Sequence, residues 1–218
     1  MMRTLLPAMV VTLLAVNAAF AQVGLGDLEN RDGILYTAQS SEPYSGPVEE
    51  PGRMTGVVRD GLRVGEWLWS YQDGTPQFLA EYDSNGVMLK RANWHPNGIQ
   101  ESSLTYRNGR AHGPMTHTDM NGVVRERHSY LNGNQHGTSE IFDHQGNVLI
   151  RTDYVEGERH GARVWFYSDG SPRWVTSWRN GERDGTWTQY TRDGTVVMQT
   201  TWEEGGLVER EANPHAVH

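Results

Sequence analysis

Residues 155–178 read VEGERHGARVWFYSDGSPRWVTSW, and residues 179–202 read RNGERDGTWTQYTRDGTVVMQTTW. Each segment contains a Gly-x-x-x-Gly pair, a strand-like run, an Asp-Gly pair, a second run and a closing tryptophan. Every landmark moves forward by 24 residues from one segment to the next. A fixed period of this length is typical of repeat architectures, in which each unit contacts mainly its neighbours. The period therefore predicts an elongated array rather than a round core.

The same period extends back through most of the chain. One set of turn glycines recurs every 24 residues, at Gly74, Gly98, Gly122, Gly146, Gly170 and Gly194. One closing aromatic residue follows each of them, at Tyr82, Tyr106, Tyr130, Tyr154, Trp178 and Trp202. Asp, Asn or Gln precedes each turn glycine, and Asn-Gly and Asp-Gly pairs favour hairpins with a type I′ turn. The unit after Gly74 departs from the pattern because Gly86 comes one place late, so we expect an altered loop there within an intact hairpin.

Alternation between the turns predicts strands with one apolar and one polar face. Ile150, Thr152 and Tyr154 share one face, whereas Arg151 and Asp153 share the other. The sequence therefore predicts an all-β fold, an elongated array of antiparallel β-hairpins that forms one twisted sheet. Such alternation is typical of an antiparallel sheet covered on one side only.

The chain divides into four predicted segments. Residues 1–21 are typical of a signal peptide, with Arg3, an apolar run and the cleavage pattern Ala19-Phe20-Ala21. Residues 22–58 form an N-terminal cap and a degenerate repeat, and residues 59–205 hold six repeats. Residues 206–218 lack a strand pattern and are expected to be a disordered tail. We therefore expect a periplasmic or secreted protein, without membrane association once the signal is cleaved, because the apolar run is short for a span.

Composition limits the partners and the chemistry. The 218 residues contain no cysteine, which excludes disulfides and thiolate metal sites. The formal net charge is −8, and an acidic balance argues against nucleic acid or anionic lipid as the partner. A protein partner remains compatible with this charge.

The repeated units resemble MORN repeats. The resemblance rests on Asn-Gly-x-x-His-Gly, an aromatic strand, Asp/Asn-Gly and a closing aromatic residue, and it covers about residues 31–205. The bacterial variant, with units of 22 to 24 residues, is the nearer match. Its members are often described as antitoxin components of toxin–antitoxin modules. The resemblance implies a hairpin array used as a binding surface, with no enzymatic residues to carry over.

No group of residues in the sequence is typical of a catalytic or metal site. His112, His136 and His160 recur in three successive units, but equivalent positions should lie about 10 Å apart, too far for one shared ion. No serine lies in a Gly-x-Ser-x-Gly elbow, and no carboxylate pair has a spacing typical of acid–base catalysis. We therefore expect no enzyme activity, no metal and no cofactor.

The tryptophans are the strongest candidates for a binding role. Most of them lie in the first unit and the last two, where packing is their default role. Trp165, Trp174 and Trp187 are the candidate binding residues, because Trp165 and Trp174 can lie on one face of a single hairpin. The leading hypothesis is a non-catalytic exported scaffold that binds a protein, with an antitoxin or immunity-type role as one form of it. The alternative is a carbohydrate or cell-wall binding module that uses exposed tryptophan rings.

Overall fold

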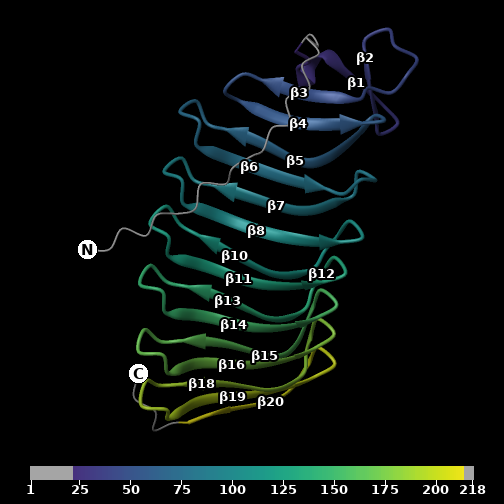
Figure 1. Cartoon of the computed structure of the whole chain (residues 1–218). Helices are drawn as coiled ribbons and strands as arrows, with labels where there is room; N and C mark the ends of the chain where they lie inside the picture. The colour runs from purple at the N-terminus through teal and green to yellow at the C-terminus, as the bar shows by residue number, and fades with distance from the viewer. Residues whose placement is uncertain (1–21, 214–218) are drawn as a thin grey trace.

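The computed structural model describes residues 22–213, so the predicted signal segment at 1–21 lies outside the described residues. The described chain contains strands and one short 3₁₀ turn, η1 (Leu25–Asp27). A small antiparallel hairpin, β1 (Leu28–Arg31) and β2 (Ile34–Thr37), stands apart from one sheet of 18 strands. The prediction of an all-β fold built from antiparallel hairpins is confirmed (Figure 1).

The large sheet follows chain order, since each long strand pairs antiparallel with the next one. The continuity across the short strands comes from direct pairing of β8 with β10, β11 with β13 and β16 with β18. The strands are β3 (Gly46–Glu50), β4 (Met54–Arg59), β5 (Leu62–Ser70), β6 (Pro76–Tyr82), β7 (Met88–Trp94), β8 (Gln100–Arg107), β9 (Arg110–Ala111), β10 (Gly113–Thr118), β11 (Val124–Leu131), β12 (Asn134–Gln135), β13 (Gly137–Phe142), β14 (Val148–Val155), β15 (Glu158–Phe166), β16 (Pro172–Arg179), β17 (Glu182–Arg183), β18 (Gly185–Tyr190), β19 (Val196–Glu203) and β20 (Gly206–Ala212).

The turns at the 24-residue glycines differ from the prediction. At the 24-residue turn glycines only the glycine has positive φ: Gly74 has φ 84° and donates its N–H to the Tyr71 carbonyl at 2.9 Å. This pattern matches a three-residue loop in which a type I turn precedes a left-handed glycine, so the prediction of type I′ turns is wrong at these positions. The Asp73 carboxylate accepts the N–H of Thr75 at 2.9 Å and stabilises this alternative.

The type I′ conformation occurs at the other turns. Asn108 and Gly109 have φ of 51° and 70°, and Asn180 and Gly181 have φ of 49° and 81°. Both central residues therefore lie in the left-handed region that this turn requires. In the irregular unit, a loop over residues 83–87 replaces this turn, while β6 and β7 still pair from Tyr82 and Met88 onward.

The N-terminal end of the sheet is capped. The N–H of Glu49 in edge strand β3 donates to the Val23 carbonyl at 2.9 Å, and that of Leu35 in β2 donates to the Gly61 carbonyl at 2.9 Å. A buried cluster lies beneath this cap, formed by Leu35, Val48, Met54, Val58, Trp67 and Ala80. The main hydrophobic core of the described chain therefore lies at this end.

The expected tail contains a strand instead. Glu204 and Gly205 have φ of 47° and 79°, and this two-residue turn pairs Glu203 with Gly206 and starts β20. The expectation of disorder over 206–218 is therefore wrong for Gly206–Ala212, while residues 214–218 lie outside the described part. A Glu-Gly turn gives a weaker sequence signal than Asn-Gly, which explains the error.

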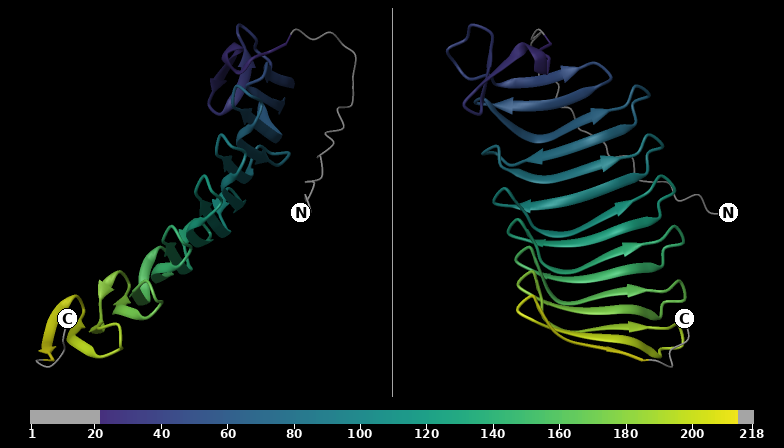
Figure 2. Two further views of the ribbon diagram at one scale, coloured as in Figure 1. Left: turned by 90° about the vertical axis from the view of Figure 1, so that its left-hand side faces the viewer. Right: turned by 180° about the vertical axis from the view of Figure 1, so that it is seen from behind.

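Away from the N-terminal core, the sheet is a single twisted layer. Figure 2 shows it edge-on, with no second layer of the described chain over either face. The expected cover on one side is therefore missing from residues 22–213 outside that core. Small side chains along the middle of the strands are instead buried by their cross-strand neighbours, and they include Ser139, Thr152, Thr176, Thr188 and Thr200.

Candidate binding site

Cross-strand pairing assigns the side chains to two faces, because directly opposite residues in an antiparallel pair lie on the same face. Trp165 on β15 lies opposite Trp174 on β16, which in turn lies opposite Gln189 on β18. Alternation along the strands places five tryptophans on this same face, Trp165, Trp174, Trp178, Trp187 and Trp202. We call it the tryptophan face, and the opposite side the polar face.

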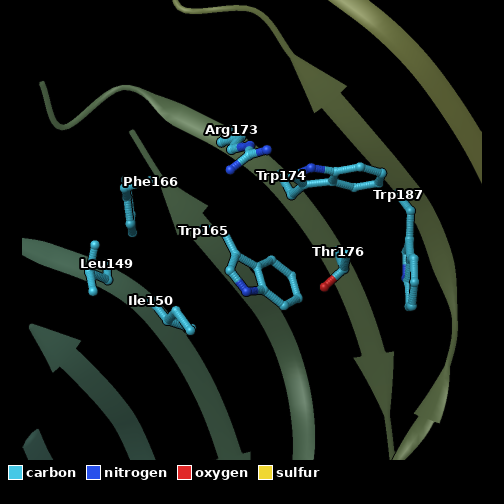
Figure 3. A pocket seen from close by; sticks show the side chains of 8 residues that line it. All are labelled: Leu149, Ile150, Trp165, Phe166, Arg173, Trp174, Thr176 and Trp187. Atoms are coloured by element: carbon cyan, nitrogen blue, oxygen red, sulfur yellow. The ribbon is translucent and has the colours of Figure 1, made fainter. Parts of the chain in front are cut away.

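A pocket of about 510 Å³ opens on the tryptophan face of the C-terminal half (Figure 3). Trp165 and Trp174 stand side by side in it, and Trp187 closes the side towards the C-terminus. The remaining lining comes from β14, β15 and β16, through Leu149, Ile150, Phe166, Arg173 and Thr176. Thr176 is 1% exposed and lies among the three rings, so it fills the space between them.

A repeated β-bulge shapes the wall of this pocket. Ile150 pairs with Ile141 and Val148 pairs with Phe142, so Leu149 has no partner opposite it. In the same way Arg173 is skipped between the pairs of Trp174 and Pro172 on β16. An extra residue in a strand bends it and re-aims the side chain. As a result, neighbouring residues such as Leu149 and Ile150 can both reach one pocket.

The bulge recurs with the repeat. Register shifts next to each tight turn skip one residue every 24 positions, at Gln77, Glu101, Arg125, Leu149, Arg173 and Val197. Each skipped residue comes three positions after a turn glycine. The repeat therefore presents one variable side chain per unit beside the tight turns, and those of the fourth and fifth units, Leu149 and Arg173, line the pocket.

A ladder of stacked rings continues from the pocket. Trp187 lies 5.3 Å from Trp178 and 5.4 Å from Trp202, measured between ring centroids. Its indole N–H donates to the Ser177 carbonyl at 3.0 Å, and that of Trp178 donates to the Thr176 hydroxyl at 2.9 Å. Tilted ring pairs at this spacing stabilise each other, so the Trp187 side of the pocket is held in place before any ligand binds.

Arginines lie over these rings. The guanidinium of Arg159 lies 3.8 Å from the Trp178 centroid, and that of Arg163 lies 4.5 Å from the Trp165 centroid. The guanidinium of Arg183 lies 4.8 Å from the Trp187 ring. Cation–π contact holds the charge at the surface of the ring without neutralising it.

Arg163 is the most constrained of these arginines. Its Nε is buried without a hydrogen-bond partner among the described residues. Burial, and then the nearby charge of Arg159, lower the pKa of its guanidinium, which stays positively charged at neutral pH because an arginine pKa starts so high. A partly buried guanidinium without an ion-pair partner, beside an apolar pocket, favours an anionic partner.

The periodic histidines make local contacts. Nδ1 of His160 lies 3.3 Å from the side-chain oxygen of Asn180, and Nδ1 of His136 lies 3.5 Å from the backbone nitrogen of Glu156. His112 lies between β9 and β10, and its backbone N–H donates to the Thr105 carbonyl. Over residues 22–213, no group of three or more His, Asp or Glu side chains could hold a metal ion.

The structure brings together all three predicted binding residues, Trp165, Trp174 and Trp187. Sequence reasoning missed the other contributors, above all Arg163 and Arg173. Their signal is present in the repeat, because Arg173 occupies the bulge position and lines the pocket, and Arg163 lies opposite Thr176 on the tryptophan face. Recognising it requires the strand register, which a period alone does not give.

Comparison with known proteins adds little. No family model and no curated relative matches this chain. Among solved structures, a complex of accessory secretory proteins 1, 2 and 3 of Streptococcus pneumoniae aligns at 14% identity and TM-score 0.30, over 57% of this chain and 22% of that chain. The Gap123 glycosylation-associated complex of Streptococcus agalactiae aligns at 15% identity and TM-score 0.30, over 58% of this chain and 22% of that one. These similarities are too weak to support any inference about function.

A separate observation concerns membranes. Within residues 22–213, no helix is long and apolar enough to cross a bilayer.

Proposed function

We propose that this chain is an exported, MORN-like repeat protein that acts as a non-catalytic scaffold and binds a protein partner on its tryptophan face. The observation that carries the proposal is the pocket formed by Trp165, Trp174 and Trp187 on an uncovered sheet. Export is supported by Arg3 and the apolar run before Ala21, and the MORN-like assignment by the 24-residue pattern.

The composition of the pocket favours protein binding. Tryptophan, tyrosine and arginine are the residues most enriched in protein-binding hot spots, which lie in well-packed pockets near the centre of an interface. Here the rings stand on paired strands, and the Trp187 ring is held between those of Trp178 and Trp202, so its side chain has little freedom left to lose on binding. A rigid, uncovered aromatic surface is what a docking site requires.

Carbohydrate binding is the second candidate, and one observation favours it. Trp165 and Trp174 lie directly opposite each other on neighbouring strands, so their rings are adjacent on an open face. Adjacent rings can stack against sugars as well as against side chains. The antitoxin or immunity role is a special case of protein binding, and its support is the resemblance alone.

Site-specific photocrosslinking tests the proposal. Phe166 lines the pocket, and its replacement by benzoylphenylalanine keeps an aromatic side chain at the same place. The full chain carrying this residue would be irradiated in cells that naturally express it, and the adducts identified by mass spectrometry. We expect a crosslinked peptide from one recurring protein, which disappears when Trp165 and Trp174 are both replaced by alanine.

The matched control carries benzoylphenylalanine at Thr186, an exposed position on the polar face, and should give no such adduct. An adduct with a sugar would support the second candidate and refute the first. The same protein crosslinked from both positions would show that binding does not use the tryptophan face. An immunity role would require, in addition, that the captured protein arrests growth when it is produced alone.

A further inference from the structure

Charge is divided between the two faces of the C-terminal half. From β14 to β20 the charged residues that the pairing assigns to the tryptophan face are arginines, namely Arg159, Arg163, Arg183 and Arg210. Arg173 has no partner in the pairing because it is the bulge residue of β16, but it lines the pocket on this face. The paired acidic residues of the same strands all fall on the polar face, namely Asp153, Glu158, Glu182, Glu203, Glu209 and Glu211. A chain with net charge −8 therefore presents a cationic surface on one side.

The arginines of the two faces also differ in their partners. On the polar face, Arg151 contacts Glu140 at 3.1 Å and Arg179 contacts Asp184 at 2.8 Å. Within residues 22–213, none of the five arginines of the tryptophan face forms an ion pair, and four of them lie over aromatic rings instead. Their charges are oriented but not neutralised, which leaves them available for an anionic group.

We infer that the tryptophan face binds an extended acidic peptide segment of another protein, with an apolar or aromatic side chain in the pocket and flanking carboxylates on Arg163 and Arg173. This inference rests on the proposed function and names the chemistry of the partner. The pocket wall of Leu149, Ile150 and Phe166 suits an apolar side chain. Arg173 lies at the same pocket, and Arg163 stands directly opposite Thr176, so carboxylates on either side of that side chain would meet a guanidinium.

The segments outside the described residues do not have the chemistry of this occupant. Residues 1–21 and 214–218 contain no aspartate or glutamate, so these segments cannot supply the carboxylate side chains. A nucleic acid is also anionic, but it carries one phosphate per nucleotide, so the acidic chain repels it at long range more strongly than it repels a peptide with a few carboxylates. A peptide with a few carboxylates satisfies the local arginines and adds an apolar side chain for the pocket.

Selection from a library of random displayed peptides tests this chemistry. The wild-type full chain would be used as bait, and the peptides bound by it compared with those bound by the double variant Arg163→Gln/Arg173→Gln. We expect the wild type to enrich sequences with aspartate or glutamate beside tryptophan, phenylalanine or leucine. Titration calorimetry with one enriched peptide should then show about a tenfold or greater loss of affinity in the double variant.

The control is Arg151→Gln/Arg179→Gln on the polar face, which lowers the net charge by the same amount. It should leave the affinity nearly unchanged, whereas added salt should weaken binding to the wild type. Circular dichroism of each variant verifies that it is folded. Because both double variants change long-range electrostatics equally, a difference between them reports on the two faces.

Several outcomes would overturn the inference. These are enrichment of basic or uncharged peptides, equal losses in the two double variants, and tighter binding of oligouridylate or chitohexaose than of the enriched peptide. Self-association that depends on Arg163, measured by sedimentation, would make a second copy the occupant and refute a separate acidic partner. The proposed function would survive these results if photocrosslinking still captured a protein, so the two failures can be told apart.

Discussion

Trp67 and Trp187 occupy the same place in two repeats that are five periods of 24 residues apart. Their local contacts agree closely. Each indole N–H donates to the carbonyl ten residues earlier, at 3.1 Å to Val57 and 3.0 Å to Ser177. Each ring also lies 4.8 Å from the guanidinium four residues before it. Yet Trp67 is 0% exposed, whereas Trp187 lines an open pocket.

The difference comes from what faces each ring. Gly56 lies opposite Trp67, and a Cβ added there would stand 2.4 Å from the ring, so the ring rests directly on the backbone. Thr176 occupies the equivalent place opposite Trp187 and holds that ring away from its strand. At the N-terminal end, Leu35 from β2 completes the cover. One repeat position therefore provides a core residue or a binding residue according to its neighbours.

The largest expected effect comes from removing the two rings in turn. Trp67→Ala should lower the free energy of unfolding by about 3–5 kcal/mol, because a buried ring leaves a cavity. Trp187→Ala should cost only about 1–2 kcal/mol, because its ring is partly exposed at an open pocket and its removal leaves no closed cavity. Urea denaturation followed by far-UV circular dichroism measures both. Equal losses of unfolding free energy in the two variants would contradict the comparison. They would show that the stability of the uncovered half depends on Trp187 as strongly as that of the core depends on Trp67.

Gly56 provides a sharper test of the same contrast. Gly56→Ala should destabilise the protein by about 1–3 kcal/mol, since the added methyl group pushes the Trp67 ring off its strand. Gly26→Ala is the matched control, because nothing lies within 4 Å of its added Cβ and its φ is not in the left-handed region. Melting temperatures of both variants would be compared with the wild type. If Gly56→Ala melted like the control, close packing of the ring on the backbone could not explain the burial of Trp67.

In the uncovered part of the sheet, cross-strand polar pairs take a larger share of the stabilisation. Glu140 on β13 lies between Arg127 at 2.8 Å and Arg151 at 3.1 Å, on the polar face. Its side chain is 14% exposed, whereas the two arginines are about half exposed. We expect Glu140→Gln to cost about 0.5–1 kcal/mol at low salt, and less at high salt because the arginines are screened.

The control for this prediction is Glu209→Gln on the same face, because the described residues give Glu209 no ion pair. Denaturation in low and high salt would separate the two substitutions. A loss at Glu140 that does not respond to salt would mean that packing of the side chain, rather than its charge, stabilises the three strands.

The sequence predicted the array because turn glycines and closing aromatic residues are local signals repeated at a fixed spacing. The type I′ prediction was wrong at the 24-residue turn glycines, since an Asp-Gly pair suits both a type I′ turn and a type I turn followed by a left-handed glycine. The choice depends on side-chain hydrogen bonds such as that from Thr75 to Asp73. Strand β20 was missed because Glu-Gly is a weak turn signal.

The candidate site was predicted in part. Trp165, Trp174 and Trp187 stand out by residue type alone. Arg163 and Arg173 do not, because an arginine on a strand is interpreted as a solvent-exposed residue by default. Only the strand register shows whether it lies on the same face as the tryptophans. The period also concealed the difference between Trp67 and Trp187. Burial depends on Gly56 and on the cap, which lie outside the repeat unit of either ring.

The smallest predicted effect concerns turns that should behave alike at both ends. Asp73 and Asp193 share one repeat position, five periods apart. The backbone N–H of Thr75 lowers the pKa of Asp73, and the Thr191 hydroxyl, followed by the N–H of Thr195, lowers the pKa of Asp193. Both carboxylates are exposed, so neither depends on the core that separates Trp67 from Trp187.

A pKa below the ordinary value of 3.8 means that folding favours the ionised carboxylate. Its stabilisation is therefore complete above that pH and is lost as the pH falls through the lowered folded-state pKa. Asp73→Asn and Asp193→Asn should each remove a small part of the stability difference between pH 6 and pH 3, by similar amounts. Melting curves across this range measure it. A clearly larger change at Asp73 would show that the N-terminal core also stabilises the turn at Asp73. The two ends of the sheet would then differ in their local hydrogen bonds as well as in their burial.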